Sequence, residues 1–248
     1  MALKRVWLPS PNYSTRSASV RLIVLHTTEG ARTYQDLGAF FAKSSTGVSS
    51  HVGIDDTLGT IGEYVKRDKK AWTQGNANSY SIAAEQCAFA KWTRSEWVNN
   101  HMNMLKNTAA WIAEEAAFYG IPIVALTSAQ AQDGRSKGVC QHINLGAAGG
   151  GHVDCDYGTG NYPMADVIAM AKGQAPTPTP PTPTPTPTPT LEDDMIIQEP
   201  DKKVYQLVYG GSGSYWRTLP DNAVKRVPAS SIISDDGSLL SLWKVGAN

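Results

Sequence analysis

Hydrophobic and polar residues follow two different periods along the first 175 residues of the chain. Residues 20–25 (VRLIVL) are an apolar run rich in β-branched side chains, which is typical of a buried strand. Shorter strand patterns occupy residues 49–54, 60–65, 81–89 and 121–126. Apolar residues recur near the helical period at residues 34–41, 94–119 and 164–171. We therefore expect an α/β domain in which helices flank a mixed central β-sheet.

A proline- and threonine-rich run ends this domain. Residues 176–190 read PTPTPPTPTPTPTPT, and proline neither donates a backbone hydrogen bond nor fits a helix or sheet interior. We expect an extended polyproline II spacer, with an O-glycosylated stalk as the alternative. The spacer separates a domain of residues 1–175 from a second domain of residues 191–248. The pattern in this second part predicts a small β-rich domain, with short strands at residues 195–198, 203–209, 215–219 and 239–245.

Composition and charge exclude several classes of protein. The 248 residues contain 22 Lys and Arg against 22 Asp and Glu, so nothing favours a nucleic-acid partner on electrostatic grounds. No apolar run reaches the roughly 20 residues that a bilayer crossing needs, so we expect no membrane partner. The first 14 residues lack the apolar core of a signal peptide, which predicts synthesis in the cytoplasm. Three cysteines, an odd number, argue against a disulfide scaffold.

Two regions carry side chains suited to metal chemistry. His26 ends the buried run at residues 20–25, a position from which a polar side chain faces a crevice. A glycine-rich segment further along contributes His142, Asp154 and Cys155. Catalytic zinc takes three protein ligands and keeps a fourth position open. His26, His142 and either Asp154 or Cys155 would supply such a set; the alternative is a glycine-rich loop with solvated polar side chains.

Four motifs, in this order, resemble those of a known enzyme family. They are IVLHTTEG, GVSSHVGIDDTLGTIGEYV, AWTQGNANSYSIAAE and QHINLG…GGGHVDCD, and together they cover about residues 15–172. The set is similar to the zinc-dependent N-acetylmuramoyl-L-alanine amidases of the phage-lysozyme and peptidoglycan-recognition type. The resemblance implies that His26, His142 and Asp154 bind zinc. The family commonly has proline after the third ligand, where this chain has Cys155, so Cys155 remains the alternative third ligand.

The resemblance also assigns catalytic residues, and three other residues are candidates for substrate binding. It implies that Glu85 is the general base and that His152 replaces a lysine that polarises the scissile carbonyl. Trp72, Asn78 and His51 would line the substrate groove, although His51 also fits a structural role and Trp72 a core position.

The function that the resemblance implies is hydrolysis of peptidoglycan. The bond cleaved would be the amide between N-acetylmuramic acid and the L-alanine of the stem peptide. We expect a monomeric endolysin that lyses the host cell and acts on the bacterial wall after release. The alternatives are a non-catalytic peptidoglycan-recognition protein on the same scaffold and a zinc peptidase that cuts within the stem peptide.

The second domain is rich in aromatic residues, which has two interpretations. The residues are Tyr205, Tyr209, Tyr215, Trp216 and Trp243. Aromatic faces stack on sugar rings, so the domain is a candidate wall-binding module on a tether. A small domain also needs large side chains for its own core, and this accounts for at least half of the set.

Overall fold

The computed structural model describes residues 2–175, 196–198, 204–210 and 213–219. The chain separates into two units, Met1–Thr177 and Pro178–Asn248, and each is described by itself. The predicted spacer at residues 176–190 lies outside the described residues, so its conformation stays a prediction. Among the described residues, no helix combines the length and the apolar character needed to cross a membrane.

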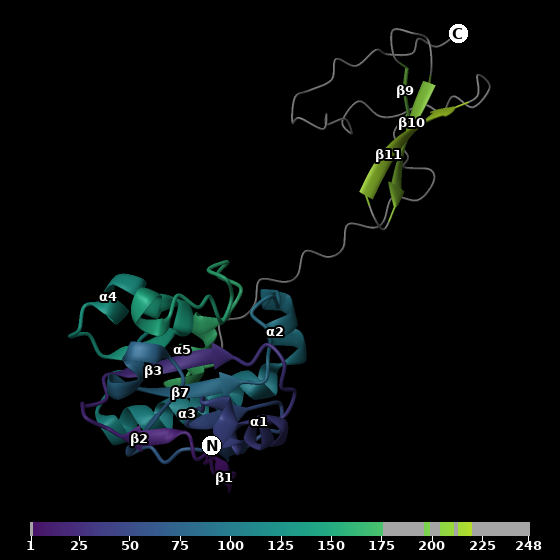
Figure 1. Ribbon diagram of the computed structural model, residues 1–248. Helices are drawn as coiled ribbons and strands as arrows, with labels where there is room; N and C mark the ends of the chain where they lie inside the picture. Colours follow the sequence, from purple (N-terminus) through teal and green to yellow (C-terminus); the bar gives the residue numbers. More distant parts are fainter. Residues whose placement is uncertain (1, 176–195, 199–203, 211–212, 220–248) are drawn as a thin grey trace. The chain divides into compact units, whose positions relative to one another are not determined.

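A six-stranded mixed sheet forms the centre of the first unit (Figure 1), as the sequence pattern predicts. Its strands, in spatial order, are β1 (Lys4–Trp7), β5 (Thr60–Glu63), β4 (Val52–Ile54), β7 (Ser81–Gln86), β3 (Leu22–Thr27) and β8 (Gly138–Gln141). Neighbouring strands are parallel except for the β4–β5 pair. A separate antiparallel pair joins β2 (Tyr13–Thr15) to β6 (Lys69–Ala71). The carboxyl ends of β4, β7, β3 and β8 therefore meet at one edge of the sheet.

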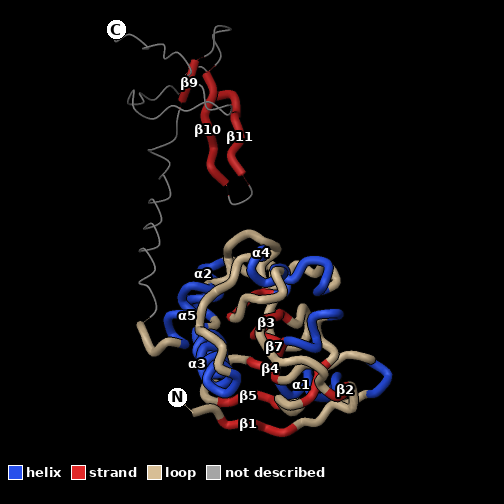
Figure 2. Tube along the Cα trace, turned by 90° about the vertical axis from the view of Figure 1, so that its left-hand side faces the viewer, coloured by secondary structure: helices blue, strands red, loops and turns tan. Residues whose placement is uncertain are grey.

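Helices cover both faces of this sheet. They are α1 (Tyr34–Phe41), α2 (Arg94–Asn100), α3 (Met102–Tyr119), α4 (Ser128–Gln132) and α5 (Met164–Ala171), with short 3₁₀ turns η1 (Ser44–Thr46), η2 (Gly75–Tyr80) and η3 (His142–Gly149). Figure 2 shows α3 and α5 on one side of the sheet and α1 on the other. Ile23 and Leu25 of β3 point into the main core with α3 and α5, whereas Leu22 and Val24 point to the opposite face.

The predicted helix at residues 94–119 is wrong in one respect, because it is two helices. The backbone leaves the helical conformation at His101, with φ −127° and ψ 28°. Nδ1 of His101 lies 2.6 Å from Oδ2 of Asp56, and its ring stacks on Trp92 with ring centres 3.9 Å apart. The other oxygen of Asp56 accepts a hydrogen bond from the backbone N of Met104 (3.0 Å), in the first turn of α3. Contacts with residues distant in sequence therefore override the helical period here.

The strand predicted at residues 121–126 is also wrong. Only an isolated parallel bridge between Ala125 and Val139 forms there. Pro122 has no backbone N–H, which removes one ladder hydrogen bond from this segment. The run predicted at residues 20–25 forms two residues later, as Leu22–Thr27, so His26 lies inside strand β3.

The second unit contains three described strands. β10 (Val204–Gly210) pairs antiparallel with both β9 (Ile196–Gln198) and β11 (Gly213–Leu219). These strands coincide with three of the four strand patterns predicted in this part of the chain. The fourth, at residues 239–245, lies outside the described residues.

Candidate metal centre

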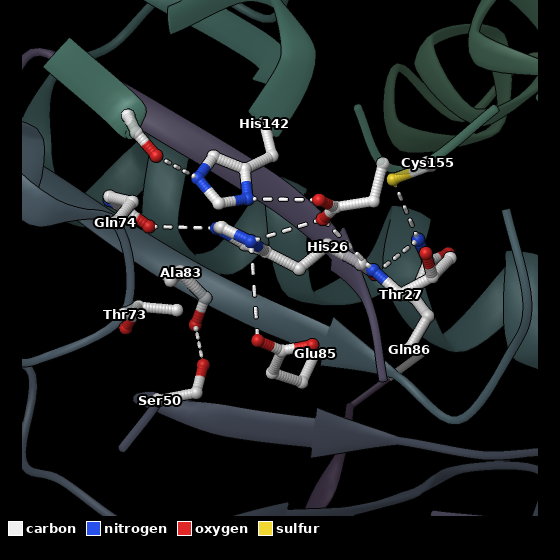
Figure 3. A network of polar contacts seen from close by, with 12 residues as sticks. His26, Thr27, Ser50, Thr73, Gln74, Ala83, Glu85, Gln86, His142 and Cys155 are labelled. Atoms are coloured by element: carbon white, nitrogen blue, oxygen red, sulfur yellow. Dashed lines mark hydrogen bonds and ion pairs between the residues drawn. The ribbon is translucent and has the colours of Figure 1, made fainter. Parts of the chain in front are cut away.

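The structure brings together His26, His142 and Asp154, the three predicted zinc ligands. Figure 3 shows the rings of His26 and His142 side by side. One potential ligand atom from each lies within 4.8 Å of the other two. Nδ1 of His26 is 3.3 Å from Oδ2 of Asp154, and Nδ1 of His142 is 3.0 Å from Oδ1 of the same carboxylate. All three side chains are buried. The cluster is the only such group of three or more His, Cys, Asp or Glu residues among the residues described.

The register of the sheet explains this arrangement. His26 is on β3 and shares a face with Leu22 and Val24, because side chains alternate along a strand. Glu85 of β7 is its direct neighbour in the parallel register. His142 follows the last residue of β8, the strand on the other side of β3. Three adjacent strands therefore deliver these side chains to one edge, where functional groups of α/β sheets gather.

The donor set fits a divalent cation such as zinc. Nε2 of His142 lies 2.8 Å from the carbonyl oxygen of Gly149, which only accepts hydrogen bonds, so Nε2 carries the proton. Nδ1 is the ring nitrogen that faces Asp154, 3.0 Å from Oδ1. Burial lowers the pKa of His26, which favours its neutral form as well. Two imidazole nitrogens and a carboxylate oxygen thus lie within 4.8 Å of one another, and zinc accepts this combination of ligands.

Glu85 lies beside the cluster with half of its carboxylate unpartnered. Oε1 is 4.0 Å from Nδ1 of His26, and Oε2 is buried without a hydrogen-bond partner among the residues that the structure describes. Burial raises the pKa of Glu85 to about 8, and the charges of Asp154 and Glu29 add to the shift. A buried carboxyl group with a free oxygen next to a metal centre is suited to proton transfer.

His152 lies at the surface above the cluster. Its ring stacks on His142, with ring centres 4.7 Å apart and planes 11° from parallel. Together with Asp154, Glu29 and Tyr157 it lines an open pocket of about 310 Å³. A ligand in this pocket would therefore reach both the cluster and the His152 ring.

Cys155, the alternative third ligand, lies outside the cluster. Its fully buried sulfur is 3.7 Å from Nε2 of Gln86 (Figure 3). Burial raises the pKa of this thiol well above its ordinary value, which disfavours the thiolate that binds metals. The structure thus places Asp154, and not Cys155, beside the two histidines.

Comparison with known proteins assigns the chain to a family. The model of the N-acetylmuramoyl-L-alanine amidase family matches residues 16–153. The chain belongs to this family. The match contains His26, Glu85, His142 and His152 and ends one residue before Asp154.

Individual relatives are more distant. N-acetylmuramoyl-L-alanine amidase A of Achromobacter lyticus is 35% identical over 82 residues, which are 32% of this chain and 45% of that protein. The match thus spans less than half the length of this curated relative. Among solved structures, the hydrolase AmiA of Staphylococcus aureus is 18% identical with a TM-score of 0.52, over 71% of this chain and 88% of that one. A PlyL mutant is 15% identical with a TM-score of 0.49, over 69% of this chain and 99% of that one. The AmiA match shows a shared fold.

All three predicted substrate contacts in this family member have hydrogen-bond partners within the fold. Trp72 is 37% exposed, and its indole N–H donates to Oγ of Ser14 (3.1 Å). Oδ1 of Asn78 accepts hydrogen bonds from the backbone N–H groups of Thr73 (3.0 Å) and Gln74 (2.7 Å). Asn78 therefore holds the loop before η2, while the exposed face of Trp72 remains open to a ligand.

His51 is an interior residue, which fits the structural role that the sequence also allowed, and its contact with substrate stays a prediction. The side chain is 4% exposed, and its Nδ1 accepts a hydrogen bond from the backbone N of Ala83 on β7 (3.1 Å). Nε2 lies 3.1 Å from the carbonyl oxygen of Lys69 on β6 and 3.1 Å from the Arg16 guanidinium. Its polar atoms are thus used within the fold. Burial, with a smaller effect from the charge of Arg16, lowers the pKa of His51 to about 3.

His51 predicts a pH dependence of stability. The unfolded chain protonates this ring near its ordinary pKa of 6.5, whereas the folded chain resists protonation down to about pH 3. Stability is therefore lost as pH falls below about 6.5, by about 1.4 kcal/mol per pH unit from this group. The stability advantage of wild type over His51→Gln should shrink by that amount per unit between pH 6 and pH 5. Urea unfolding at several pH values measures it, and a constant difference would contradict the buried neutral ring.

Gln74 is a residue that the sequence analysis missed. It is buried, and its Oε1 lies 2.8 Å from Nε2 of His26 (Figure 3). The available signal was a polar residue inside the AWTQG motif, but its partner lies 48 positions earlier in the chain.

Proposed function

We propose that this chain is a zinc-dependent N-acetylmuramoyl-L-alanine amidase. The bond cleaved is the amide between the lactyl carbonyl of N-acetylmuramic acid and L-alanine of the stem peptide. The observation that carries the proposal is the buried cluster of His26, His142 and Asp154, with the free oxygen of Glu85 beside it, in a member of the amidase family. A non-catalytic recognition protein would need neither a complete ligand set nor a buried carboxyl group next to it.

Metal binding, proton transfer and oxyanion stabilisation are assigned to different residues. His26, His142 and Asp154 would hold the zinc ion, which when bound supplies Lewis acidity and lowers the pKa of water. Glu85, in its deprotonated form, accepts a proton from the attacking water as the carbon–oxygen bond forms. It returns that proton to the alanine nitrogen as the carbon–nitrogen bond breaks. His152, at the mouth of the pocket, donates a hydrogen bond to the developing oxyanion.

Identification of the end groups released from purified peptidoglycan tests this function. The zinc-loaded chain should release new N-terminal L-alanine without new reducing sugars. The same chain treated with a chelator should release none, and added zinc should restore release. New amino termini from residues inside the stem peptide would establish a peptidase instead. Binding to peptidoglycan with no new end groups would establish a recognition protein.

The second domain has a supporting role in this proposal: it binds the bacterial wall and keeps the enzyme on the polymer. The proposal is supported by the aromatic residues along this part of the sequence. In this account the protein is a monomeric endolysin that is made in the cytoplasm and reaches the wall after release. The two roles are connected, because an endolysin degrades the wall to which the second domain would bind.

Truncation at the linker tests this division of labour. A chain ending at residue 175 keeps every proposed ligand and catalytic residue and has its own hydrophobic core. It should cleave soluble muropeptides at close to the full-length rate, because those substrates need no tether. Cleavage of whole walls should fall, because the tether no longer raises the local concentration. Equal rates of wall cleavage by both chains would contradict the wall-binding role.

A further inference from the structure

Gln74 lies against the side of His26 that faces away from the proposed metal. The residue is 1% exposed, and its Oε1 is 2.8 Å from Nε2 of His26 (Figure 3). Nδ1 of that ring faces Asp154. Its backbone is also fixed, because the N–H of Gln74 donates to Oδ1 of Asn78 (2.7 Å). Gln74 is therefore held in place independently of its contact with the histidine.

The orientation of the Gln74 amide follows from its other neighbour, Ser81. The Ser81 hydroxyl donates its single proton to the carbonyl oxygen of Ala77 (2.5 Å). Its oxygen is then left as the acceptor for the N–H of the Gln74 amide nitrogen Nε2. Because the nitrogen of the amide points to Ser81, the oxygen must point to His26. Three hydrogen bonds in sequence thus fix which end of Gln74 the histidine meets.

The orientation of the Gln74 amide determines the tautomer of His26. An amide oxygen only accepts, so Nε2 of the ring carries the proton and Nδ1 keeps its lone pair on the side of Asp154. His142 has the same arrangement, with the carbonyl oxygen of Gly149 in the role of Gln74. Both rings are therefore held in the tautomer that a metal ligand needs, one by a backbone group and one by a side chain.

We propose that Gln74 is a positioning residue of the metal centre, which fixes the tautomer and ring orientation of His26 and so strengthens metal binding. The inference rests on the proposed zinc site and adds to it a residue that does not touch the metal. Mutation of a residue that hydrogen-bonds a metal ligand typically lowers metal affinity by about 10–100-fold. Ser81 acts one step further away, through its control of the amide orientation.

Zinc affinity of the full chain, measured by competition with a chromophoric chelator, tests the proposal. Gln74→Met keeps the length of the side chain and removes the acceptor, so zinc binding should weaken by about 10–100-fold. Gln74→Glu keeps an acceptor oxygen at the same distance and should restore most of that affinity. Ser81→Ala frees the amide to turn and should give a smaller loss. Ring ¹⁵N spectra of the metal-free chain should show the Nε2–H tautomer of His26 in wild type and a mixture of tautomers in Gln74→Met.

A matched control separates positioning from general loosening of the segment. The buried hydroxyl of Ser49 accepts a hydrogen bond from the backbone N of Trp72 (3.0 Å) but does not touch Gln74. Ser49→Ala should therefore loosen the segment before η2 and leave zinc affinity unchanged. Wild-type affinity in Gln74→Met, or the same loss in Gln74→Glu as in Gln74→Met, would overturn the positioning role. Failure of the wild-type chain to bind zinc would instead overturn the proposed metal centre itself.

Discussion

Asp154→Ala and His142→Ala should each lose zinc, with affinity falling by more than the roughly 100-fold that partners outside the ligand set can cost. Each removes one of only three protein ligand atoms, and the remaining pair offers no third position to the cation. Amidase activity should fall below detection in both variants at micromolar zinc. Glu85 is still present, but without zinc nothing described at the site lowers the pKa of the attacking water. Metal content after gel filtration and end-group release from peptidoglycan are the two measurements.

Cys155→Ser is the matched control for this experiment, since it alters the adjacent residue and the alternative ligand. The thiol is buried beside Gln86 and away from the two histidines, so zinc affinity should stay close to the wild-type value. Circular dichroism should show that all three variants are folded. Retention of zinc by Asp154→Ala together with its loss in Cys155→Ser would mean that the third ligand is one residue further along the chain.

The parts of this structure that the sequence predicted are those set by local pattern. The apolar run that becomes β3 is visible as such, and its alternation already places His26 on a definite face. The helix at Tyr34–Phe41 follows from the helical period of its apolar residues. Thr33 is its N-cap, and the Thr33 side chain accepts a hydrogen bond from the backbone N–H of Asp36. The chemical character of the glycine-rich segment was enough to indicate His142 with either Asp154 or Cys155, because those residue types in one short stretch are typical of metal ligands. The preference for Asp154 came from the family resemblance.

The parts that the sequence did not predict depend on partners far away along the chain. The break between α2 and α3 is made by Asp56, which lies 45 residues before His101 and contacts both His101 and the first turn of α3. Strand β8 is only four residues long and is defined by its pairing with β3. His51 was expected to be a structural or groove residue, because an open zinc site needs only three ligands. Its burial between β6 and β7 emerges only in three dimensions.

The roles of Glu85 and Gln74 differ in a way that mutation can separate. Gln74 touches the side of His26 opposite the cluster, so its loss should act first on metal affinity. Glu85 lies on the cluster side, 4.0 Å from Nδ1 of His26, and contributes no atom to the ligand set. A defect in turnover without a defect in metal binding is therefore the signature expected of Glu85 and not of Gln74.

Glu85→Gln should bind zinc as wild type does and lose about 10²–10⁴-fold in turnover, the usual contribution of a general acid–base group. Glutamine has the same shape and fills the same buried space, so the fold and the ligands are undisturbed. It accepts no proton at neutral pH, however, and the attacking water and the leaving alanine nitrogen both lose their proton carrier. The experiment measures zinc stoichiometry and kcat on a soluble muropeptide for the same protein sample. Near-normal kcat with one bound zinc would remove Glu85 from the mechanism, and loss of zinc from Glu85→Gln would move Glu85 into the ligand set.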